Sequence, residues 1–118
     1  MALFTNNSFN KTDLIATLPL VKSKAQALQM ATLVKSKSEA ALLLNLLTHK
    51  DCAAKAAWVF GIACNEQPQL FSHLPTAMLN ILECTQNKAV ARALLRSLWC
   101  LPLPKNEVAR AKELAKAY

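Results

Sequence analysis

Apolar residues recur along this chain at intervals of three and four positions, the spacing that places them on one face of a helix. The longest such run covers residues 51–67 and is apolar or small on nearly every side, with Lys55 as the one charge between Cys52 and Cys64. Other helices must cover a helix of this kind on most sides. At about 1.5 Å per residue it is roughly 20 Å long, shorter than the roughly 30 Å core of a bilayer. We therefore predict a buried central helix and no membrane span.

The same spacing, together with capping residues and prolines, predicts six further helices. They cover residues 11–18, 23–34, 39–48, 75–84, 88–100 and 107–118. Ser38, Asp51, Asn87 and Asn106 are expected to be N-caps, because their side chains accept the free N–H groups of a first turn. Pro75 suits the first position of a helix. The residues expected to face the core include Ala27, Met30, Ala31, Val34, Met78, Leu79 and Leu82.

Composition supports an all-helical chain. Hydrophobic residues make up 53% of the 118 positions, and Gly61 is the one glycine. A β-rich fold would need turn glycines and alternating β-branched residues, and neither is present. The length allows one domain with a modest core. We expect a polar lead-in over residues 1–10, with Phe4 and Phe9 tucked against the first helix, and one helical domain over residues 11–118.

Two of the predicted helix pairs resemble each other. A shift of 37 residues places Lys55 on Arg92 and Ala56 on Ala93. Each segment closes a pair, the first formed by residues 39–48 and 51–67 and the second by residues 75–84 and 88–100. A helix pair that repeats at this period is typical of an α-solenoid, in which neighbouring pairs stack to bury their apolar faces.

The second pair carries a recognisable pattern. Its two parts are Leu74-Pro75-x3-Leu79-x2-Leu82 and Asn87-x2-Val90-x-Arg92-Ala93-x2-Arg96-x-Leu98. This pattern resembles a HEAT repeat, which has a proline-led first helix, a short turn and a second helix with a basic residue near its start. The usual HEAT aspartate of the turn is present as Asp51 and is replaced by Asn87 in the next pair. A continuous ladder of Asp-to-Arg contacts is therefore not expected.

Three further segments are similar to a family of small bacterial HEAT-like proteins of unassigned biochemistry. They are Lys22-Ser-Lys-Ala-Gln-Ala-Leu, the stretch from Lys55-Ala-Ala-Trp-Val to Asn65-Glu-Gln-Pro-Gln-Leu-Phe, and the break Leu101-Pro-Leu-Pro. The resemblance covers roughly residues 20–118. It implies a short right-handed α-solenoid of stacked antiparallel helix pairs, HEAT- or armadillo-like, with about seven helices. Such a fold implies a scaffold for protein binding.

The net charge of +7 makes an acidic partner possible. Lys88, Arg92 and Arg96 follow one another at four-residue spacing on one helix face, and Lys55 is the equivalent charge of the preceding repeat. Stacked like charges destabilise a helix by a few tenths of a kcal/mol per pair. A binding strip for phosphates or an acidic peptide would offset that destabilisation.

A solvated face is the simpler interpretation of the same charges, with Glu66 or Glu83 neutralising them in part. It is favoured because no aromatic residues alternate with the charges to stack on bases. Nucleic-acid binding through Lys55, Lys88, Arg92 and Arg96 is therefore the second hypothesis. It would be weak, sensitive to salt and independent of sequence.

The cysteines give no metal site in this interpretation. Cys52, Cys64, Cys84 and Cys100 are spread along the chain without a Cys-x-x-Cys motif or paired histidines. Each falls in an apolar helical pattern, where a free thiol acts as a small hydrophobic group. Free thiols suit a reducing compartment, and the N-terminal residues lack the features of a signal peptide. A cytoplasmic location is expected.

Catalytic chemistry is not expected either. His49 and His73 are predicted to lie at helix ends or in loops, and no serine framed by glycines accompanies them. With one glycine there is no phosphate-binding loop, so no cofactor is expected. Trp58 and Trp99 lie in apolar runs and are predicted to pack in the core rather than to anchor a partner.

The last predicted helix looks like the first helix of another pair. Its apolar side, formed by Val108, Ala111, Leu114 or Ala115, and Tyr118, is expected to be partly uncovered. Either the chain is a fragment of a longer array, which is favoured, or this end docks a partner or a second copy. The sequence thus predicts a non-catalytic interaction module that presents its second helices to a protein or an acidic peptide.

Overall fold

The computed structural model describes residues 11–116, and the regular secondary structure of this part of the chain is entirely helical, without strands. Its seven α-helices are α1 (Lys11–Thr17), α2 (Lys24–Ala31), α3 (Lys37–Asn45), α4 (Ala53–Glu66), α5 (Pro75–Cys84), α6 (Lys88–Leu98) and α7 (Lys105–Ala115). Three short 3₁₀ turns follow α1, α3 and α4: η1 (Leu18–Leu20), η2 (Leu46–Thr48) and η3 (Pro68–Leu70). The all-α prediction and the number of helices are confirmed. The expectations for residues 1–10 and for Tyr118 lie outside the described residues.

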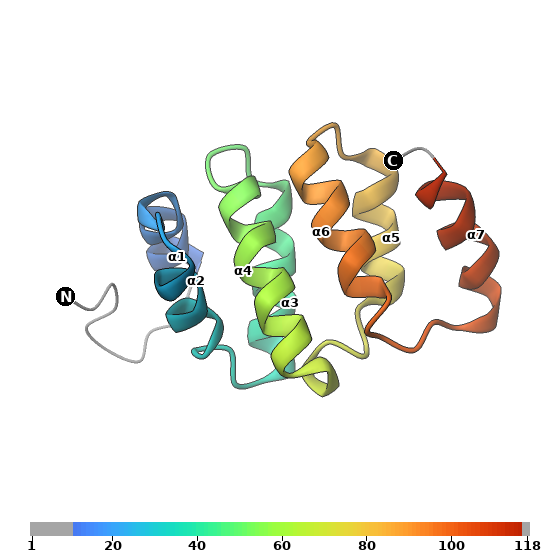
Figure 1. Cartoon of the computed structure of the whole chain (residues 1–118), viewed down its shortest axis with the longest axis horizontal. Helices are drawn as coiled ribbons and strands as arrows, with labels where there is room; N and C mark the ends of the chain where they lie inside the picture. Colours follow the sequence, from blue (N-terminus) through green and yellow to red (C-terminus); the bar gives the residue numbers. More distant parts are fainter. Residues whose placement is uncertain (1–10, 117–118) are drawn as a thin grey trace.

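The helices form pairs that lie beside one another in an elongated molecule of 44 × 27 × 22 Å. In Figure 1, α4 lies in front of α3, and α6 lies in front of α5. Helices α2, α4 and α6 form one row, because α4 contacts both of the others. Helix α7 continues the rear row, since it contacts α5. Helices α4 and α6 run in the same direction, and α5 and α7 run opposite to them (Figure 1).

The centre of the molecule is α4, which contacts α2, α3 and α6. Its buried residues include Val59 and Phe60, while Ile62 is partly buried against the same core. The Phe60 ring meets Phe71 edge to face, with ring centroids 5.0 Å apart. Because the helix is small and apolar on most sides, it can be packed from three directions. The predicted buried central helix is confirmed.

Two helices begin with the same reciprocal cap. Ser23 and Ser36 each accept a hydrogen bond, at 3.2 Å, from the backbone N–H of the residue three positions later, Gln26 and Glu39. The side chains of Gln26 and Glu39 accept the N–H of the lysine before each serine at 2.8 Å. Four backbone donors are thus satisfied by four side chains. The predicted N-cap at Ser38 is wrong, because Ser36 and Glu39 complete each other's bonds and start α3 earlier.

The other predicted caps have mixed outcomes. Asn87 is confirmed, because its Oδ1 accepts the N–H groups of the second and third residues after it at 2.9 and 3.3 Å. Asp51 is not a cap: the N–H of Cys52 donates to the His49 carbonyl at 3.1 Å, and the helix starts only after this turn. Asn106 is not a cap either, because α7 starts one residue before it, directly after a proline.

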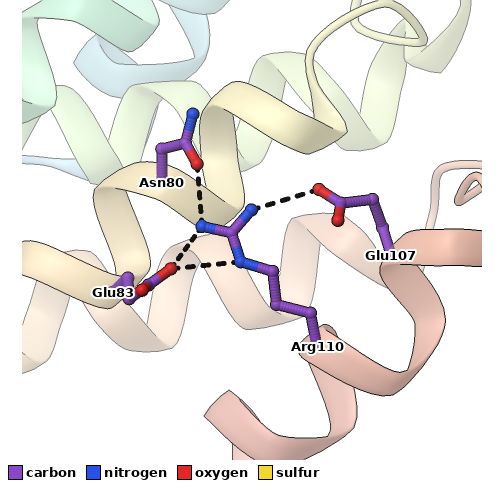
Figure 2. Close-up of polar contacts among 4 residues, drawn as sticks. All are labelled: Asn80, Glu83, Glu107 and Arg110. Carbon is purple, nitrogen blue, oxygen red and sulfur yellow. Dashed lines mark hydrogen bonds and ion pairs between the residues drawn. The ribbon is translucent and has the colours of Figure 1, made fainter.

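An arginine holds α7 against α5. Arg110 donates from Nη2 to Asn80 Oδ1 at 2.7 Å and from Nε to Glu83 Oε2 at 3.1 Å, and Nη2 also contacts Glu83 Oε2. From Nη1 it donates to Glu107 of its own helix at 3.2 Å (Figure 2). Glu107 is 8% exposed, so its carboxylate depends on this pairing. The hydrogen bond and the charge of Glu83 raise the pKa of Arg110, so the guanidinium keeps the charge that these bonds require.

Arg110→Met should therefore loosen α7 and leave the rest of the fold intact. Methionine keeps an unbranched apolar stem in place of the aliphatic part of arginine but removes all of its donors, so Asn80, Glu83 and Glu107 lose their partner. Hydrogen exchange is expected to become faster across residues 105–115 and to stay unchanged in α4. Lys112→Met, at an exposed position of the same helix, is the control. If hydrogen exchange in α7 is equally fast in Arg110→Met and in the parent chain, apolar packing alone holds this helix in place.

Candidate functional site

The row formed by α2, α4 and α6 carries a groove of about 570 Å³, which we call the central groove. It is lined by Lys24, Leu28, Ala57, Trp58, Gly61, Ile62, Asn65, Glu66, Ala93, Arg96, Ser97 and Cys100. Small residues of α4 and α6 make room for it, while Leu28, Trp58 and Ile62 give it apolar walls. These three larger residues are not fully buried, so they remain open to a ligand.

Gly61 in the groove is not required by the backbone or by packing. Its φ angle is not positive, and a Cβ atom added to it would meet nothing within 4 Å. Glycine inside a helix destabilises it by roughly 0.5–1 kcal/mol relative to alanine. The effect of Gly61 is therefore to leave open space on a helix that alanine would suit better.

Basic side chains border the central groove. Lys24 and Arg96 line it from α2 and α6, and both are exposed. Lys55, about one turn before Trp58 on α4, places its Nζ 5.4 Å from the centroid of the Trp58 ring, a cation–π arrangement. Glu66 is the one acidic residue in the lining. The surroundings therefore favour a ligand with negative charge.

The central groove contains only part of the predicted basic strip. Lys88, Arg92 and Arg96 are all exposed, and none of them forms an ion pair within residues 11–116. Of the three, only Arg96 lines the central groove. The expected neutralisation by Glu83 is wrong, because that carboxylate binds Arg110 on the other side of α5.

Two long thiol contacts show the register between α4 and α6. The Cys64 thiol donates to the Ser97 carbonyl and the Cys100 thiol to Asn65 Oδ1, each at 3.9 Å. These contacts join residues 33 and 35 positions apart. The same offset along two helices of equal direction places Lys55 level with the first turn of α6, where Lys88 lies. Lys55 therefore lies beside Lys88 and widens the basic strip, but it does not line the central groove.

Lys24 is a groove residue that the sequence pattern missed. It is the first residue of α2, and nothing in its local sequence distinguishes it from the other lysines. Its position across from α4 follows only from the packing of α2 on that helix. Gly61 did carry a signal, because a single glycine inside a helical apolar run has no local purpose.

The tryptophan prediction is wrong for Trp99. This residue is 85% exposed. The face of α6 that carries Val90, Leu94 and Leu98 points inward, and the helix ends just before Trp99. Trp58 is half-buried and lines the central groove. Large apolar side chains left in water are typical of contact surfaces for partners.

The cysteines divide into two kinds. Cys52 and Cys64 are buried, as predicted, whereas Cys84 and Cys100 are exposed, so the expectation that all four are core residues is wrong. Burial raises the pKa of the Cys64 thiol to about 11, and the neighbouring Cys100 adds to this while the Ser97 hydroxyl opposes it. Burial and then Asp51 raise the pKa of Cys52. Buried thiols of this kind are poor nucleophiles.

No catalytic arrangement is evident among the titratable residues described. His49 Nδ1 accepts the backbone N–H of Asp51 at 3.3 Å and so stabilises the turn before α4, and His73 lies in an exposed turn. Within residues 11–116, no three His, Cys, Asp or Glu side chains lie close enough to hold a metal ion. The Ser97 hydroxyl is buried at the groove and has no hydrogen-bond partner of normal geometry there, although it lies near the Cys64 thiol.

Two further findings bear on the class of protein. Across the part of the chain that the structure covers, every helix falls short of the length and apolar character that crossing a membrane requires. Comparison of the chain with protein-family models, with curated proteins and with solved structures found no match.

Proposed function

We propose that this chain is a non-catalytic helical-repeat module that binds an acidic peptide segment of a partner protein in the central groove. The three helix pairs would form a short right-handed α-solenoid of the HEAT type, acting in the cytoplasm, where free thiols such as Cys84 and Cys100 stay reduced. The row of second helices would then be the binding face.

One observation carries the proposal: the central groove joins three helices and combines apolar walls with basic edges. Leu28, Trp58 and Ile62 offer contact area for an apolar side chain. Lys24 and Arg96, on opposite helices, offer cations to acidic residues on either side of it. Acidic residues beside one apolar anchor are therefore the peptide chemistry that fits.

Peptide display on the immobilised chain tests this. A random library of about 12-residue peptides should yield sequences rich in Asp and Glu around one or two large apolar residues. Gly61→Leu should abolish capture of these peptides, because leucine fills the groove while favouring the helix. Gly61→Ala is the matched control, expected to retain binding and to raise the free energy of unfolding by about 0.5–1 kcal/mol.

Failure of the proposal would be clear from the same experiment. If the selected peptides show no acidic bias, the basic edges of the groove have no role in recognition. If they bind the Gly61→Leu variant as well as the parent chain, they bind elsewhere.

Nucleic-acid binding is the second candidate, favoured by the exposure of Lys88, Arg92 and Arg96 without ion-pair partners among residues 11–116. It would show as saturable binding of DNA or RNA at about 50 mM salt, with an affinity that falls steeply as salt rises. Arg92→Glu should abolish it, whereas Lys37→Glu, which changes the charge equally on α3, should have a smaller effect. Gly61→Leu would leave it unchanged, which separates the two candidates.

A further inference from the structure

A second groove, of about 460 Å³, lies between α6 and α7 and is almost entirely apolar; we call it the end groove. Leu95 lines it from α6, Trp99 and Leu103 from the segment that follows α6, and Val108 from α7. The groove exists because α7 packs on α5 in the rear row, which leaves the outer side of α6 uncovered. Trp99 is the most exposed large apolar residue within residues 11–116.

The position of the end groove indicates the shape of its occupant. Helices α2, α4 and α6 form a row (Figure 1). The end groove is lined by residues of α6 and α7, so it lies beside the last helix of that row. Helix α6 reaches its own place by packing on α4 in front of α5. A helix laid along the end groove would pack on α6 in front of α7 in the same way. The site therefore suits an amphipathic helix with one apolar face.

The charged residues beside the end groove indicate which charge its occupant would carry. Lys112 and Lys116 lie along its α7 side. Lys112 is exposed and has no ion-pair partner within residues 11–116, and Lys116 forms only an exposed pair with Glu113 at 3.1 Å. Acidic residues beside the apolar face of a docked helix would meet these two lysines.

The same charges argue against a second copy of this chain as the occupant. A symmetric contact would bring Lys112 and Lys116 of both copies to one interface. Glu107, the other acidic residue of α7, is already bound to Arg110 and cannot neutralise them. Like charges at an interface weaken association.

We propose that the end groove binds an amphipathic helix of a partner protein in which Glu or Asp residues flank the apolar face. This site is separate from the central groove and does not depend on it. Trp99 would be buried on binding, and Lys112 and Lys116 would select acidic helices over basic ones.

A pair of designed peptides tests the proposal. Each has about 14 residues with leucines at helical spacing, and the flanking positions are all Glu in one peptide and all Lys in the other. Binding is followed by the fluorescence of Trp99 in a Trp58→Phe background, where it is the one remaining tryptophan. The Glu peptide should shift the emission to the blue and bind about tenfold more tightly than the Lys peptide at low salt.

Two variants assign the binding to the end groove. Val108→Glu places a carboxylate inside the groove, outside the buried core, and should weaken binding of the Glu peptide by about tenfold or more. Lys112→Glu/Lys116→Glu should reverse the preference, so that the Lys peptide binds more tightly. Gly61→Leu, which fills the central groove, should change neither result.

Three outcomes would overturn the proposal. The first is equal binding of both peptides, and the second is absence of a fluorescence change with either. The third is a dimer in sedimentation that Val108→Glu dissociates, since this would make a second copy the occupant. A monomer that binds the Glu peptide would support it.

Discussion

Phe60→Ala is expected to lower the free energy of unfolding by about 3–5 kcal/mol, which is most of the stability of a marginal domain. The side chain is fully buried on α4, where it packs edge to face on Phe71. Its removal would leave a cavity at the centre of the array, since α4 is fixed by helices on three sides and cannot move in to fill it. Urea denaturation followed by circular dichroism measures the effect.

Leu20→Ala is the control for this measurement. Leu20 is 57% exposed at the end of η1, so its truncation should change the free energy of unfolding by less than about 0.5 kcal/mol. A loss below about 1 kcal/mol for Phe60→Ala would mean that the core can collapse around α4, and the stacked arrangement of the pairs would be refuted.

Alkylation should divide the four cysteines into a fast pair and a slow pair. Cys84 and Cys100 are exposed and should react with iodoacetamide in the folded chain, whereas Cys52 and Cys64 should react only after unfolding. For Cys64 the pKa of about 11 leaves a thiolate fraction at pH 7.5 about a hundred times smaller than that of a thiol with the ordinary pKa of 9.0. Mass spectrometry of timed samples gives the four rates. Rapid labelling of Cys64 would contradict its burial against α6.

The Cys64 thiol should also make the free energy of unfolding decrease as the pH rises above about 9. The pKa of Cys64 is raised from its ordinary value of 9.0 in the unfolded chain to about 11 in the fold. The neutral thiol therefore contributes fully to stability below about pH 9, and the contribution is lost as the pH rises towards 11. Cys64→Ala should reduce this loss in urea denaturation at pH 8 and 10.5, whereas Cys84→Ala, at an exposed position, should leave it unchanged.

The features that could be predicted from the sequence are those that residues close together in the chain determine. The covered central helix follows from one apolar run, and Pro75 and Asn87 start their helices by local chemistry. The wrong caps failed because two local signals competed. Ser36 prevailed over Ser38 because only the former has a glutamate three residues later. Asp51 was displaced because the preceding turn closes on His49.

The parts of the site that could not be predicted depend on contacts between distant segments. Arg110 contacts Glu83 and Asn80, which lie 27 and 30 positions away in the sequence, and no periodic pattern predicts such a pairing. Trp99 follows directly after core residues, and its exposure depends on where the neighbouring helix lies. The central groove is formed by three helices together, so no single helix shows it.

The dependence of the array on α4 has a mechanical consequence. The pairs on either side are joined chiefly through this one helix, so bending of the elongated molecule would have to open its contacts with α2 or α6. The central groove touches α2, α4 and α6 at once. A ligand seated there would contact the two outer pairs at once and so oppose such bending.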